Sequence, residues 1–319
     1  MTGWRQWFFG VLLIAALVGA VVHFGELRNF AELVRKVEPG WLIFAVALQL
    51  STYVSLALGW KVVLEQAEGR PFRLPILIRI ALSKLFADQA VPTAGMSGNV
   101  VLVDQLVGIG ATRGAAVATL LLSMLGFYAS YMVFAVVALV LLWLQGDATP
   151  LMVGLVTTFM LVALGIPALA LWLRQRGSRP LPPAIEAVRP IRQMVGILGE
   201  APAGLLKDRP LIGIVTLLNA AVFAADILTL WALVHRLGAD ITLAVALLAF
   251  VLASIAVTLG PIPFGLGSFE VVCTSTLHML DLGLETALTG TVLLRLLILW
   301  LPLLPGLLMS RHILLRSRH

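Results

Sequence analysis

Residues 258–270 read TLGPIPFGLGSFE, a stretch that places two prolines, three glycines and a glutamate in one of the most apolar parts of the chain. The preceding residues 241–257 are almost wholly apolar, and so are most residues after position 270. Proline and glycine interrupt helices, and a carboxylate inside an apolar segment is costly. We therefore expect an irregular turn between two short helices at this place.

The composition of the chain is that of a membrane protein. Of its 319 residues, 60% are hydrophobic and 12% are charged, whereas a soluble domain has about 25% charged residues. The mean hydropathy of +1.03 agrees. The net charge of +6 does not indicate a nucleic-acid partner, because most basic residues lie in loops between apolar segments, as orientation signals do.

The chain has apolar segments of two kinds. A full membrane span requires roughly 20 apolar residues. Two regions, 74–110 and 242–284, are interrupted by turn residues, the first at VPTAGMSG (91–98), and their halves are short for a crossing. The segments expected to cross completely are Trp7–Phe24, Trp41–Trp60, Ala115–Leu144, Leu151–Leu173, Leu211–Val234 and Thr286–Met309.

Basic residues orient these segments. The loop 174–210 carries seven Lys and Arg residues, so we place it and both chain termini in the cytoplasm. The loop 145–150 has none and is expected outside. Each broken region then begins and ends on one side of the membrane. We therefore predict two re-entrant hairpins, 74–110 from the cytoplasm and 242–284 from outside, in a bacterial or archaeal cytoplasmic (inner) membrane.

The two hairpins also suggest an internal repeat. With an offset of 171 residues the turn elements coincide: Pro92 with Pro263, Ser97 with Ser268, and Asn99 with Glu270. Inverted repeats with discontinuous helices are common in transporters. We predict an all-α polytopic membrane protein, a single integral domain over 1–319. It would form an inverted-repeat bundle of about six full spans plus two re-entrant helical hairpins, with repeats 1–144 and 151–309.

The turns of the hairpins are candidate anion sites. Non-helical backbone at membrane depth is tolerated only where protein buries it or a cavity solvates it, and a helix N-terminus attracts anions. We expect Ser268 to cap a helix that begins after Gly267, and Ser97 or Asn99 to do the same in the first hairpin. The alternative is that glycine and proline only make tight turns between packed helices.

Ionisable residues inside apolar segments extend the candidate site. Glu270 and Arg295 have opposite charges and are expected to pair, either as a structural ion pair or with Arg295 meeting a lipid phosphate. Asp226 lies deep in a span, and Asn219 lies on the same helix face. The residues expected to form the substrate path are Pro92, Ser97, Gly98, Asn99, Asn219, Asp226, Pro263, Gly265, Gly267, Ser268, Glu270 and Arg295.

Other patterns are weaker. Lys84 and Asp88 have i,i+4 spacing and are interpreted as a pair that neutralises itself. With one cysteine, Cys273, and no Cys/His cluster, we expect no metal site. No nucleophile elbow, Walker or Rossmann pattern is present, so we expect neither an enzyme nor a cofactor. Transport without an ATP site would be driven by an ion gradient or run downhill.

The last third of the chain resembles a known family. The stretch Pro263-Phe-Gly-Leu-Gly-Ser-Phe-Glu270, followed by a helix with Arg295, Trp300, Pro302 and Gly306, is similar to the flippase-like transmembrane domain of the lysylphosphatidylglycerol synthases. The turn Pro92 to Gly98 resembles the upstream turn of that family. Two departures are Phe264, where a glycine is commonest, and Asn99, where many members have an acidic residue.

The resemblance implies a stand-alone relative that moves lipid between leaflets. The soluble aminoacyl-transferase domain has no counterpart in this sequence, so we expect no synthase activity. The implied substrate is an anionic (glyco)phospholipid or a polyprenyl-type lipid, with a lipid-biosynthesis enzyme as a protein partner. Two alternatives remain open: a non-transporting scaffold for lipid or envelope biosynthesis, and a secondary transporter of a small anion.

Overall fold

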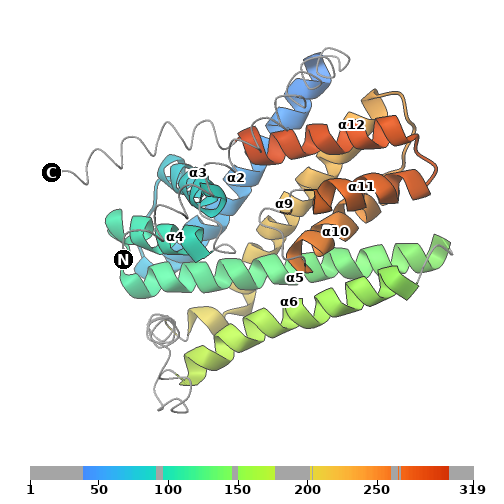
Figure 1. The fold of residues 1–319 in the computed structure, drawn as a ribbon. Helices are drawn as coiled ribbons and strands as arrows, with labels where there is room; N and C mark the ends of the chain where they lie inside the picture. The colour runs from blue at the N-terminus through green and yellow to red at the C-terminus, as the bar shows by residue number, and fades with distance from the viewer. Residues whose placement is uncertain are drawn as a thin grey trace, which may run out of the picture.

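The computed structural model describes residues 39–90, 96–145, 150–176, 202, 204–259, 265 and 267–301, and these contain helices and no strand (Figure 1). The prediction of an all-helical protein is thereby confirmed for this part of the chain. The helices are α2 (Pro39–Glu68), α3 (Leu74–Ala90), α4 (Met96–Gly108), α5 (Arg113–Gln145), α6 (Pro150–Arg176), η1 (Leu205–Lys207), α9 (Arg209–Arg236), α10 (Leu243–Leu259), α11 (Ser268–Met279), α12 (Leu284–Arg295) and the π-helical turn η3 (Leu296–Trp300).

In the described part of the chain, three helices are long and apolar enough to cross a bilayer: Gly40–Glu68, Arg113–Leu144 and Arg209–Arg236. At 1.5 Å per residue, 28 residues extend about 42 Å, more than the roughly 30 Å hydrocarbon core. Leu243–Leu259 is a shorter apolar helix. The chain is thus a multi-pass membrane protein. The predicted Trp7–Phe24 span lies outside the described residues, and the count of six spans stays a prediction.

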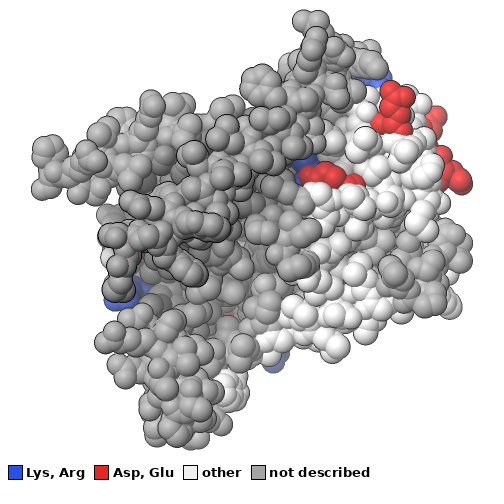
Figure 2. Space-filling view, in the orientation of Figure 1, with Lys and Arg blue, Asp and Glu red and all other residues white. Residues whose placement is uncertain are grey.

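The outer surface of the described helices suits lipid. Large apolar side chains on α5 face outward, with Val133 57%, Val140 48% and Trp143 75% exposed. In the view of Figure 2 most of the described surface lacks Lys, Arg, Asp and Glu, and most of the acidic groups in view lie toward the upper right. Such a surface is stable next to acyl chains and not in water.

Close packing of α9 against α2 and α5 forms the centre of the bundle. Ser55 Oγ of α2 donates to the Leu218 carbonyl at 2.8 Å, and Ser130 Oγ of α5 donates to the Thr216 carbonyl at 2.6 Å. A Cβ atom on Gly126 would lie 2.8 Å from Val215 Cγ1. Small side chains and cross-helix hydrogen bonds are the usual means of helix association in membranes.

Two pairs of short helices occupy the predicted hairpin regions. α3 packs on α4, and α10 packs on α11. Their lengths of 17, 13, 17 and 12 residues correspond to about 18–26 Å, which is too short to cross a bilayer. The tips at 91–95 and 260–264 lie outside the described residues. The membrane side from which each hairpin enters, and the inverted repeat, stay predictions.

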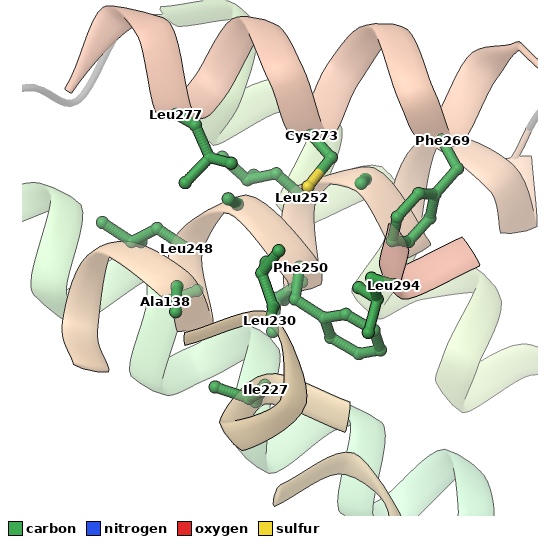
Figure 3. Packing of buried hydrophobic residues seen from close by; sticks show 14 of the residues in the cluster. Ala138, Ile227, Leu230, Leu248, Phe250, Leu252, Phe269, Cys273, Leu277 and Leu294 are labelled. Atoms are coloured by element: carbon green, nitrogen blue, oxygen red, sulfur yellow. The ribbon is translucent and has the colours of Figure 1, made fainter. Parts of the chain in front are cut away.

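The largest apolar cluster anchors the second hairpin. Buried residues of α10 and α11 interlock with side chains of α5, α6, α9 and α12. Figure 3 shows Phe250 of α10 and Phe269 of α11 near one another in this cluster, with Leu294 beside them. The two phenyl rings meet edge to face with centroids 5.9 Å apart. The start of α11 is therefore held firmly against its surroundings.

Candidate functional site

The turn before α11 requires glycine at two positions. Gly265 and Gly267 have φ values of 61° and 82°, in the left-handed region that side chains with a Cβ atom disfavour. A Cβ atom on Gly265 would also collide with the Val257 side chain of α10. The predicted break after Gly267 is correct, and it brings the start of α11 close to the end of α10.

A single carboxylate closes this helix start and holds the buried arginine. Glu270 Oε2 accepts the backbone N–H of Gly267 at 2.8 Å, and Glu270 Oε1 accepts from Arg295 Nε at 3.0 Å. The side chain of Arg295 is only 10% exposed and that of Glu270 is 22% exposed. The expected pair is therefore present, and its carboxylate also occupies the position where a helix N-terminus binds anions.

The predicted role of Ser268 as helix cap is wrong. Gly267 is the N-cap residue, and Ser268 is the first residue of α11. Its hydroxyl donates to the Gly265 carbonyl at 3.1 Å. The carboxylate of Glu270 takes over the cap, because at position N3 it reaches back to the N-cap N–H.

Besides Glu270, the ring of Phe269 contacts Arg295. Its guanidinium carbon lies 4.8 Å from the centroid of the Phe269 ring, a cation–π contact. The π-helical turn η3 begins at the next residue, a local irregularity often found at functional sites. α9 packs on α12, and α2 packs on η3. The segment around Arg295, α12 with η3, thus packs against α2, α9 and α11.

In the first hairpin the predicted caps are also wrong, because Ser97 and Asn99 lie inside α4. The carboxylate comes instead from α3. Asp88 Oδ1 accepts the backbone N–H of Gly98 at 2.8 Å, and Asp88 Oδ2 pairs with Lys84 Nζ at 2.7 Å. A Cβ atom on Gly98 would collide with the Asp88 carboxylate.

The two hairpins thus share one arrangement. In each, a carboxylate accepts a backbone N–H at the start of the second helix and is paired with a cation. The carboxylates come from opposite arms, since Asp88 precedes the turn and Glu270 follows it. The 171-residue offset in the sequence had aligned Glu270 with Asn99 and not with Asp88. The i,i+4 spacing of Lys84 and Asp88 predicted their pairing but not the contact of Asp88 with Gly98.

Asp226 lies between α9 and α2. Gln49 Nε2 donates to Asp226 Oδ1 at 2.9 Å and to Thr229 Oγ1 at 3.2 Å. Asn219 bonds elsewhere: its Nδ2 donates to the Val215 carbonyl at 2.8 Å and lies beside Gly126 of α5. Sequence reasoning missed Gln49, although it is the one amide side chain in the predicted span Trp41–Trp60.

Some predicted positions are not described. Pro92 and Pro263 lie outside the described residues, and of Ser97 only the helical backbone is described. Within the described ranges, no group of three or more His, Cys, Asp or Glu side chains is placed to hold a metal ion.

Nearly the whole chain matches a known family of membrane regions. The family described as "Lysylphosphatidylglycerol synthase TM region" matches residues 7–306. The match therefore includes both hairpins, the carboxylates at their turns and Arg295. The comparison with curated proteins gives no match.

Proposed function

We propose, from the premise that this chain belongs to the lysylphosphatidylglycerol synthase TM region family, that it moves an anionic lipid between the leaflets of a membrane. The family supports a membrane role connected with lipids. In this proposal the substrate is an anionic (glyco)phospholipid or a polyprenyl-type lipid, and no covalent bond of it changes. The membrane is the cytoplasmic membrane of a bacterium or archaeon, with both termini of the chain in the cytoplasm.

The observation that carries the proposal is the shared carboxylate of Glu270. One anionic group satisfies both a buried guanidinium and the N-terminus of α11. A lipid phosphate has the same negative charge and more acceptor oxygens, so it can accept from the same two donors. Glu270 therefore acts as an internal substitute that keeps the site neutral when no lipid is bound.

An exchange of partners gives this site a low barrier. An unpaired charge at the centre of a membrane helix costs roughly 2.5–3.5 kcal/mol. Arg295 avoids this cost in the empty protein through Glu270, and in the loaded protein through phosphate. Since the guanidinium is paired in both states, the headgroup enters without leaving it bare, and the displaced Glu270 carboxylate, whose side chain is 22% exposed, is solvated by water instead. The lipid replaces one strong ion pair with another of similar strength.

The short hairpins support the same reading. Because α10 and α11 end within the bilayer thickness, the start of α11 can lie at membrane depth. The first hairpin has the same feature, with Gly98 and its Asp88 partner. The predicted inverted repeat requires these two sites to open to opposite sides of the membrane. Together they would form a path for the headgroup while the acyl chains stay in lipid.

Lipid exchange in reconstituted liposomes tests the proposal. Fluorescent phosphatidylglycerol in the inner leaflet is protected from external dithionite until it crosses. We expect the protein to accelerate crossing, and Arg295→Ala to lower the rate on the order of 10- to 100-fold, since hydrogen bonds to charged groups contribute about 1.5–3 kcal/mol. Arg295→Lys should keep part of the rate, because it keeps the charge.

The matched control is Lys61→Ala. Lys61 pairs with Glu65 at 3.2 Å, and both side chains are 31% exposed, so the variant removes one cation without touching the site. Its rate should equal that of the unmodified protein. A protein no faster than empty liposomes, with phosphatidylglycerol, cardiolipin and polyprenyl phosphate probes alike, would refute lipid translocation. An Arg295→Ala rate equal to the control would refute the site.

A further inference from the structure

We propose that Asp226 is a proton-binding site that couples lipid movement to a transmembrane pH gradient. This inference rests on the proposed function and adds its driving force. Four features of Asp226 support this role: its position, its uncharged surroundings, its hydrogen bonds and the helices that it joins.

Asp226 lies near the middle of a candidate membrane span. It is within about 5 Å of the midpoint of α9 along the helix axis, and Gln49 is within about 7 Å of the midpoint of α2. Both helices are candidate membrane spans. The Asp226 side chain is only partly buried, whereas Gln49 is 2% exposed. An ionisable group at this depth that keeps accessible surface is typical of proton relays in transporters.

The surroundings of Asp226 are uncharged. Among the described residues its hydrogen-bond partner is the amide of Gln49, and no cation pairs with it. Tyr53 of α2 is the titratable group that interacts with it electrostatically. α10 has no titratable residue. The other titratable groups of α9 and of the helices packed on it are Lys61, Glu65, Glu68, Arg113, Tyr128, Tyr131, Lys207, Arg209, His235, Arg236, Glu285 and Arg295.

The hydrogen bonds favour a proton over a metal cation. Thr229 Oγ1 donates to the Ala225 carbonyl at 2.7 Å, so its oxygen is left to accept from Gln49. This orients the amide nitrogen of Gln49, and not its oxygen, toward Asp226. A nitrogen donor repels a sodium ion, which needs several oxygen ligands. The second carboxylate oxygen, Oδ2, has no hydrogen bond to the described residues and is free to carry a proton.

Protonation of Asp226 acts on the contact between α2 and α9. When the carboxyl is ionised, the Gln49 hydrogen bond is charge-assisted and holds the helices together. When it is protonated, the same bond is weaker. α9 packs on α12 and α2 packs on η3, so both helices reach the segment around Arg295. A change in their contact is thereby transmitted to the lipid site.

The step is balanced without further reagents. An O–H bond forms at Asp226 with a proton from water on one side, and breaks with release of that proton to water on the other. At one proton per lipid, a gradient of about one pH unit supports roughly tenfold asymmetry of the lipid between leaflets. Without a gradient the lipid distributes evenly.

The test measures the leaflet distribution of fluorescent phosphatidylglycerol in proteoliposomes with an imposed pH gradient, with and without nigericin to collapse it. The variants are Asp226→Asn, Asp226→Glu and the control Asp240→Asn, whose side chain just beyond α9 is 98% exposed. We expect about tenfold asymmetry for the unmodified protein, the control and Asp226→Glu. Asp226→Asn should move lipid downhill with no asymmetry.

The outcomes separate the two proposals. If the unmodified protein moves lipid but ignores the gradient, or follows a sodium gradient instead, the proton site is refuted and translocation stands. The same holds if Asp226→Asn responds as the control does. If the unmodified protein moves no lipid, both proposals fail.

A second variant covers poor folding of Asp226→Asn. Gln49→Leu leaves the carboxyl intact and removes its donor. We expect it to shift the pH at which the translocation rate is half-maximal, because the ionised form loses its partner. A merely structural role would lower the rate equally at every pH, and that result would refute the assignment.

Discussion

The crossing of α9 and α12 gives a sharp test of the packing that positions Arg295. Gly290 of α12 is buried against Val234 of α9, which is fully buried. A Cβ atom on Gly290 would lie 2.5 Å from Val234 Cγ2 and 3.7 Å from Val234 Cβ. Gly290→Ala therefore forces the two helices apart or moves the valine, whose χ1 angle is stiff in a helix.

The structure allows the magnitude to be worked out. Overpacking of this kind costs about 1–3 kcal/mol. Val234→Ala alone should cost about 1 kcal/mol, because lipid is as apolar as the interior and only packing contacts are lost. In the double variant the added Cβ atom meets the alanine at 3.7 Å, an ordinary contact. The pair should therefore cost about 1 kcal/mol, less than the sum of about 2–4 kcal/mol.

Unfolding of the purified protein in mixed detergent micelles, followed by tryptophan fluorescence, measures the four free energies of the cycle. Gly213→Ala is the matched control, because no atom lies within 4 Å of a Cβ atom there. Additive effects of Gly290→Ala and Val234→Ala would refute the contact. So would a Gly290→Ala protein as stable as the control.

Three further predictions concern the hairpins and the α2–α9 contact. Glu270→Gln keeps an oxygen for the Gly267 N–H but removes the charge opposite Arg295, so it should lower the unfolding free energy by about 1–3 kcal/mol; a loss no larger than that of Glu285→Gln would contradict it. Gly98→Ala should cost about 1–3 kcal/mol by displacing Asp88, whereas Gly108→Ala, with open space around its Cβ position, should be neutral or stabilising in the same unfolding assay. Ser55→Ala removes one hydrogen bond between α2 and α9 and should lower the unfolding free energy by about 0.6 kcal/mol. A loss above about 2 kcal/mol would contradict the view that only this one bond is lost.

The sequence was informative where local pattern determines structure. Composition predicted helices in a membrane, and the glycines of 258–270 predicted the break before α11. The pairing of Glu270 with Arg295 followed from two opposite charges in apolar surroundings, each of which needs a partner. These inferences rest on two physical principles only: the free-energy cost of a charge in lipid and the backbone conformations that glycine prefers.

Contacts between distant segments were beyond such reasoning. Gln49 and Asp226 are 177 residues apart, and periodicity gives the face of a helix but not the helix that covers it. The spacing of Asn219 and Asp226 places them on one face of α9. In the structure, however, Asn219 lies beside α5, whereas Asp226 lies beside α2. Asp88 caps α4 only because the hairpin folds α3 back onto it, which its spacing from Lys84 does not show.

The single cysteine of the chain has a practical consequence. Cys273 lies in α11 and is 0% exposed, within the cluster that anchors the second hairpin. A maleimide can reach its sulfur only when α11 separates from α10 or α12. The natural protein is therefore already a single-site conformational reporter. The rate at which maleimide labels Cys273, measured with and without lipid, reports how often the hairpin opens. This measurement requires no engineered residue.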